Sequence, residues 1–157
     1  MIEIAKIKKK QRICVALLVL NVAFIWGNSL LPGSVSGAIS QFVRDILAFL
    51  FSGGSTDPNA GHGLLRKLAH FMEFASLGAL FAWLFAMYRK PIPVALPCGF
   101  AVACIDETIQ LFVPDRGPAV KDVLIDTSGV LLGIILLFFG YIICKKQAKQ
   151  PIKEISQ

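Results

Sequence analysis

Four long apolar runs alternate with short polar segments along the chain. The first run covers residues 13–31 and contains no ionisable residue, and the others cover 68–88, 92–113 and 123–144. Each run is close to the roughly 20 residues that an α-helix needs to cross a lipid bilayer. The connections at 89–91 and 114–122 combine proline with charged residues, which is typical of turns between antiparallel helices. The pattern predicts an all-α integral membrane protein, a bundle of four transmembrane helices.

A polar segment at 32–67 interrupts this pattern and contains one compact apolar block at 42–51. The block is too short to cross a membrane. Its residues Ile46, Phe49 and Leu50 recur at helical spacing, which predicts a short amphipathic helix. Such a helix either lies in the plane of the lipid head groups or covers the mouth of the bundle.

Basic residues precede the first apolar run. Five Lys and Arg residues lie between residues 6 and 12, a flank that also fits the start of a signal peptide. The apolar run is longer than the roughly 7 to 15 residues of a signal-peptide core. We therefore expect this helix to remain as a membrane anchor.

Composition narrows the class of protein further. Hydrophobic residues make up 55% of the chain and charged residues 17%, which excludes a soluble globular domain. The net charge of +6 alone would be compatible with a nucleic-acid partner. The cations, however, lie at the ends of apolar runs rather than along one surface, which argues against such a partner. The cysteines show no metal-binding or redox spacing; they are Cys14, Cys98, Cys104 and Cys144.

The distribution of cations also predicts the orientation in the membrane. Eleven of the sixteen Lys and Arg residues lie in 1–12, 89–91 and 145–157. Because Lys and Arg near span ends are retained in the cytoplasm, the N-terminal segment 1–12 and the tail 145–157 are both predicted to be cytoplasmic. The segments 32–67 and 114–122 then form outer loops.

Polar side chains inside the second and third spans share helix faces. His70 and Glu73 are three residues apart, and Asp106 and Gln110 are four apart, so each pair lies on one side of its helix. A charged side chain facing lipid near the bilayer centre costs at least about 2.5 to 3.5 kcal/mol. We therefore expect these side chains to face the interior of the bundle.

The fourth span carries a stripe of acids and glycines. Asp122 lies two turns and Asp126 one turn before Gly129, and Gly133 follows one turn later. The Gly-x-x-x-Gly spacing lets a neighbouring helix approach closely. Each feature alone has a structural explanation: Asp122 fits a helix N-cap, and a glycine pair often serves packing only. Their shared depth with the other polar pairs predicts one polar site that opens toward the outer face.

Three ordered motifs carry a resemblance to a known family. They are Lys67-Leu-Ala-His-Phe-Met-Glu-Phe74, Asp106-Glu-Thr-Ile-Gln110 followed by Pro114-Asp-Arg116, and Asp122-Val-Leu-Ile-Asp-Thr-Ser-Gly129. This order resembles the VanZ-like proteins of the bacterial cytoplasmic membrane, over most of residues 64–135. The resemblance implies a link to teicoplanin resistance, and it identifies recurrent polar positions. These positions are Lys67, His70, Glu73, Asp106, Glu107, Gln110, Arg116 and Asp122. They are the candidate binding residues together with Asp126, at a position where an asparagine is usual in the family.

The function expected from these features is that of a VanZ-like membrane protein of the bacterial cell envelope. It would contribute to teicoplanin-type glycopeptide resistance through an outward-facing polar site that binds a lipid or wall-precursor head group. The alternative is a membrane-embedded enzyme acting on a lipid phosphate or glycan. In that case Glu73, Asp106 and Asp122 serve as acid, base or metal ligands, and His70 donates a proton.

The expected partners follow from the same residues. Membrane lipids surround the spans, and a lipid-linked cell-wall precursor or a glycopeptide is the expected occupant of the polar site. No phosphate loop or hydrolase motif accompanies the cluster, so no organic cofactor is indicated. Carboxylate and amide oxygens suit a divalent cation such as magnesium or calcium, which leaves a metal ion open.

Overall fold

The computed structural model describes residues 2–52, 62–88, 92–117 and 119–147, and all regular structure in these residues is helical. This confirms the expected all-α class for the described part of the chain. The predicted turn at 89–91 and the tail beyond residue 147 lie outside it. The elements in chain order are α1 (Ile2–Ser29), α2 (Gly33–Ser52), α3 (His62–Met87), the 3₁₀ turn η1 (Ile92–Val94), α4 (Ala95–Gln110) and α5 (Val120–Gln147).

Three of these helices are long and apolar enough to cross a membrane. The segments are Ala5–Ser29 in α1, Leu65–Met87 in α3 and Val120–Lys145 in α5. Large apolar side chains such as Leu20, Phe24 and Leu136 are exposed on their outer faces, where they contact membrane lipid. The chain is therefore a helical protein of the membrane.

The third expected span, residues 92–113, differs from the other three in length. Helix α4 has 16 residues, which gives about 24 Å at roughly 1.5 Å per residue and falls short of a hydrocarbon core of about 30 Å. Pro93 and Pro97 explain the late start, because proline lacks the amide hydrogen of a regular helix and fits only its first turn. The chain forms η1 there before α4 begins.

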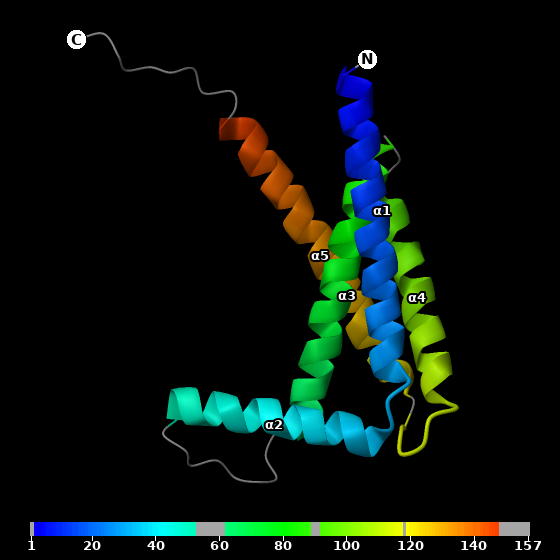
Figure 1. Cartoon of the computed structure of the whole chain (residues 1–157), viewed down its shortest axis with the longest axis vertical. Helices are drawn as coiled ribbons and strands as arrows, with labels where there is room; N and C mark the ends of the chain where they lie inside the picture. Colours follow the sequence, from blue (N-terminus) through cyan, green and yellow to red (C-terminus); the bar gives the residue numbers. More distant parts are fainter. Residues whose placement is uncertain (1, 53–61, 89–91, 118, 148–157) are drawn as a thin grey trace, which may run out of the picture.

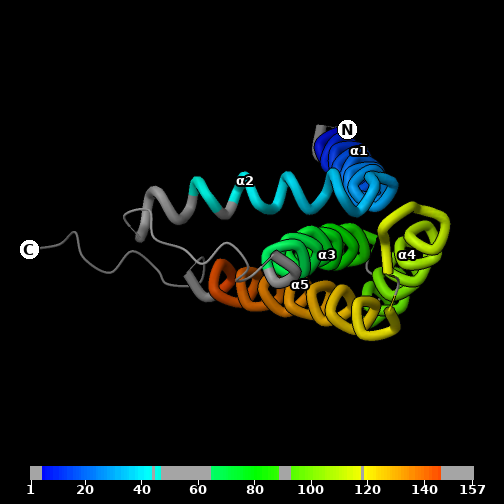
Figure 2. The backbone as a smooth tube through the Cα atoms, turned by 90° about the horizontal axis from the view of Figure 1, so that it is seen from below, coloured from blue at the N-terminus to red at the C-terminus, as the bar shows by residue number. Residues whose placement is uncertain are grey.

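Helix α3 lies at the centre of the bundle. Figure 1 shows α1 and α4 beside it and α5 crossing behind it, while α2 runs across one end, nearly perpendicular to the others. Seen along the bundle in Figure 2, α1, α4 and α5 surround α3 on three sides. The first residues of α1 and the last described turns of α5 lie at the end opposite α2.

Close contact between α3 and α5 forms the middle of the core. Phe74, Leu77 and Val130 are fully buried there. A methyl group at Gly133 would lie 1.8 Å from the backbone oxygen of Ala75, which is too close for any side chain. The glycine stripe predicted on the fourth span therefore faces α3 within this chain.

Helix α2 begins well before the apolar block predicted at 42–51. Its first residue, Gly33, donates its amide hydrogen to the Pro114 carbonyl at 3.1 Å. A Cβ atom at Gly33 would lie 1.9 Å from the Asp115 backbone oxygen, so only glycine fits. The start of α2 is thus packed against the turn between α4 and α5.

Candidate functional site

The three polar motifs meet at the end of the bundle that α2 crosses. The first turns of α3 and α5 and the last turns of α4 lie at this end (Figure 1), because the helices alternate in direction. Between them is a small, partly open pocket with a cavity volume of about 20 Å³. Its lining combines charged and amide side chains with one apolar residue: Arg66, Lys67, His70, Glu107, Gln110, Asp122, Ile125 and Asp126.

Asp106 is the most deeply buried ionisable group of this cluster. It is fully buried, and its Oδ2 accepts hydrogen bonds from Ser29 Oγ at 2.8 Å and from Gln110 Nε2 at 3.0 Å. Gln110 Nε2 also lies 3.3 Å from Ser29 Oγ. The spacing of four residues on α4 places Gln110 directly over Asp106. The carboxylate is therefore held in a fixed orientation by α1 and α4.

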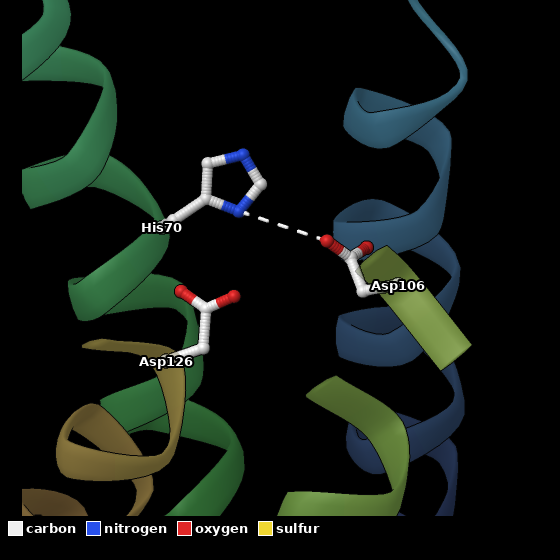
Figure 3. A group of neighbouring side chains, drawn as sticks. All are labelled: His70, Asp106 and Asp126. Atoms are coloured by element: carbon white, nitrogen blue, oxygen red, sulfur yellow. Dashed lines mark ion pairs between the residues drawn. The ribbon is translucent and has the colours of Figure 1, made fainter. Parts of the chain in front are cut away.

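His70 and Asp126 complete a group of three side chains from three different helices. His70 Nδ1 lies 4.0 Å from Asp106 Oδ2. Figure 3 shows the Asp126 carboxylate, from α5, pointing toward both. One possible ligand atom from each of the three residues lies within 4.8 Å of the others. Asp126 is only 3% exposed.

The rim of the pocket is formed by one ion pair and one hydrogen bond to the main chain. Lys67 Nζ lies 2.9 Å from Asp122 Oδ1, and both side chains are partly exposed. Glu107 Oε1 accepts a hydrogen bond from the backbone amide of Ala119, just before α5 begins. These contacts join α3 and α4 to the start of α5.

Glu73 and Arg116 face α1 rather than the pocket. Glu73 Oε1 accepts a hydrogen bond of 2.9 Å from Asn28 Nδ2. Arg116 donates from Nε to the Leu31 carbonyl at 3.1 Å and from Nη2 to the Asn28 carbonyl at 2.9 Å. Burial lowers the pKa of Arg116, yet a guanidinium stays charged in proteins. Its positive charge therefore stabilises the C-terminal end of the α1 dipole.

Three further residues belong to this end of the molecule but were not among the sequence-based candidates: Asn28 and Ser29, which bond to Glu73 and Asp106, and Arg66, which lines the pocket. The sequence feature that could have indicated Asn28 and Ser29 is their position along the chain. Asn28 and Ser29 form a polar pair at the end of an apolar run, at the same depth as the candidate cluster.

The fold and this cluster define the class: a helical membrane protein with ionisable side chains buried together at one end of its bundle. Within that class, the chain belongs to the VanZ/LLP1 family, since the family model matches residues 13–143. The expected family is thus confirmed, over a longer stretch than the three motifs cover. No curated protein and no solved structure matches the chain.

Proposed function

We propose that this VanZ-family protein belongs to the envelope of a bacterium and binds the polar head group of a lipid or of a lipid-linked wall precursor. Through that binding it would contribute to teicoplanin-type glycopeptide resistance. The observation that supports the proposal best is the open, charged pocket between α3, α4 and α5 at the end of an otherwise apolar bundle. A lipid whose acyl chains lie against the apolar helices would have its head group at the level of this pocket.

The pocket offers complementary chemistry for such a head group. Arg66 supplies a cationic donor for phosphate oxygens, and Lys67, paired with Asp122, adds a second positive charge at the rim. Glu107 and Asp126 supply acceptors for sugar hydroxyl or ammonium groups. A ligand that carries both anionic oxygens and hydroxyl donors, such as a glycosylated lipid phosphate, would match both halves of the lining.

The proposed topology has four crossings with both termini in the cytoplasm and the pocket on the outer side of the cytoplasmic membrane. The alternating helix directions and the distribution of cations support it. Helix α2 would then lie in the outer head-group layer. Its exposed apolar residues Val35, Ile39, Phe42 and Ile46 recur at helical spacing, as an interfacial helix requires.

The alternative of an enzyme that uses Glu73, Asp106 and Asp122 together receives less support. Of its three proposed carboxylates, Glu73 is engaged by Asn28 and Asp122 by Lys67. These two side chains also lie on opposite sides of the cluster, toward α1 and toward the rim. A joint role as acid, base or metal ligands would require both contacts to break.

Susceptibility to teicoplanin tests the proposed function. Susceptible bacteria would express the wild-type chain or one of three variants that neutralise a cluster carboxylate: Glu73→Gln, Asp106→Asn and Asp122→Asn. The control Asp115→Asn removes an exposed acid outside the pocket, and asparagine tolerates the positive φ of 58° found there. Immunoblots of the membrane fraction would verify equal abundance.

The expected result is that wild type and Asp115→Asn raise resistance to the same level and that the cluster variants lose the increase. If the wild-type chain does not change susceptibility at all, the resistance role is wrong. Equal resistance in all four variants would instead show that the cluster does not serve that role.

A further inference from the structure

The group formed by His70, Asp106 and Asp126 has a geometry that hydrogen bonding does not explain. The three residues come from α3, α4 and α5, and their side chains point toward a common centre (Figure 3). Their potential ligand atoms lie within 4.8 Å of one another. The His70 side chain is 13% exposed, and the two carboxylates are buried almost completely.

Several polar atoms of this group have no hydrogen-bond partner among the described residues. They include His70 Nδ1 and Asp106 Oδ1. Asp126 is 97% buried, its carboxylate is aimed at His70 and Asp106, and it forms no hydrogen bond or ion pair within the described part of the chain. Buried polar groups in proteins are normally paired, so these atoms indicate a missing partner of positive charge.

The charges around the group lead to the same conclusion. In and beside the cluster five carboxyl groups face three cationic side chains, so the acids outnumber the cations by two. The residues are Glu73, Asp106, Glu107, Asp122 and Asp126 against Arg66, Lys67 and Arg116. One divalent cation would balance this excess where the side chains are least accessible to water.

We propose that His70, Asp106 and Asp126 bind a divalent transition-metal cation, with zinc as the best match. One imidazole nitrogen and two carboxylate oxygens are ligands that zinc accepts, whereas magnesium prefers oxygen alone. Tetrahedral ligands with bonds of about 2.1 Å lie about 3.4 Å apart. The potential ligand atoms now lie within 4.8 Å of one another, so the pairs need to close by up to about 1.4 Å.

The surroundings support the proposed ligands. Ser29 and Gln110 fix the Asp106 carboxylate through Oδ2, as residues around metal ligands commonly do. Three protein ligands leave a fourth position open on a tetrahedral ion. Because His70 and Asp126 also line the pocket, that position would face it. An anionic head-group oxygen would bind there, a step that rests on the proposed function, whereas the metal site itself does not.

Metal binding by the full chain tests this proposal. The protein would be purified in detergent without a polyhistidine tag, stripped with EDTA and dialysed separately against Zn²⁺, Mn²⁺ and Mg²⁺. Bound metal would then be measured by elemental mass spectrometry. The central variant is Asp126→Asn, which keeps the shape of the side chain and removes its negative charge, so we expect it to fold. Asp115→Asn is the matched control, and circular dichroism would verify helix content.

We expect wild type and Asp115→Asn to bind one equivalent of Zn²⁺. Asp126→Asn should bind Zn²⁺ at least about 100-fold more weakly. Removing a residue that only contacts a metal ligand already costs up to about 100-fold in affinity, and Asp126 is proposed as a ligand itself. Cobalt substitution would add a visible spectrum that His70→Gln changes. The proposal is overturned if wild type binds neither Zn²⁺ nor Mn²⁺, if it binds Mg²⁺ only, or if Asp126→Asn binds as tightly as wild type. Because these measurements do not involve antibiotic, they fail or succeed independently of the resistance test.

Discussion

At the scale of single residues, the cluster is held by hydrogen bonds between helices that are distant in sequence. Ser29 ends α1, and its hydroxyl reaches Asp106 on α4 in the buried interior. A hydrogen bond to a charged group contributes about 1.5 to 3 kcal/mol, and more is lost when the remaining partner stays buried. The Ser29 hydroxyl should therefore matter for stability as well as for the orientation of the carboxylate.

We predict that Ser29→Ala lowers the free energy of unfolding by about 1.5 to 3 kcal/mol. The matched control is Ser128→Ala, because Ser128 is exposed and its hydroxyl bonds only to carbonyls of its own helix. Unfolding of both purified variants would be followed by circular dichroism in mixed micelles. Equal losses in the two variants would contradict a specific role for the Ser29–Asp106 bond.

The candidate residues on α3, α4 and α5 were predictable because ionisable side chains inside apolar runs are costly unless they face one another. The spacing of Asp106 and Gln110 also indicated a shared helix face. The partners on α1 were not predictable in the same way. Asn28 and Ser29 are uncharged, and their contacts depend on how α1 packs beside α3 and α4, which no local pattern encodes.

At the scale of elements, the bundle depends on how closely α5 approaches α3. Backbone atoms of Phe71 and Ala75 occupy the space where side chains at Gly129 and Gly133 would lie. Because the obstructing atoms belong to the main chain, they cannot rotate away. The helices would have to separate, and the pocket between their first turns would widen with them.

We predict that Gly133→Ala lowers the free energy of unfolding by about 1 to 3 kcal/mol, as overpacking does in well-packed cores. Gly140→Ala on the same helix is the control, since a Cβ atom there meets nothing within 4 Å. Alanine favours helix over glycine by up to about 1 kcal/mol, so the control should be neutral or slightly more stable. Thermal unfolding in detergent would measure both, and a stable Gly133→Ala would refute the close contact.

Two elements differ from the sequence-based expectation for physical reasons. Helix α4 is short because prolines occupy the start of the apolar run and the chain turns after Gln110. Helix α2 is longer than the block at 42–51 because it begins at Gly33, within the segment that was expected to be an outer loop. The contact of Gly33 with the turn between α4 and α5 holds this start in place.

At the scale of the whole molecule, the two ends of the bundle differ in charge. The basic first turns of α1 lie opposite α2, whereas most of the carboxylates lie at the end that α2 crosses. This asymmetry favours one orientation in a bilayer, since cations near span ends are retained in the cytoplasm. In the proposed orientation the pocket would lie on the outer side of the membrane.

The orientation is testable with single cysteines in whole cells. In a chain with Cys98, Cys104 and Cys144 replaced by serine and the buried Cys14 retained, Asp115→Cys would report on the α2 end and Lys10→Cys on the opposite end. Both positions are exposed, so accessibility to a membrane-impermeant maleimide depends on the side of the membrane alone. We expect Asp115→Cys to be labelled in intact cells and Lys10→Cys only after permeabilisation. The reverse pattern would place the pocket in the cytoplasm, where glycopeptides do not reach, and labelling of both would rule out an anchored α1.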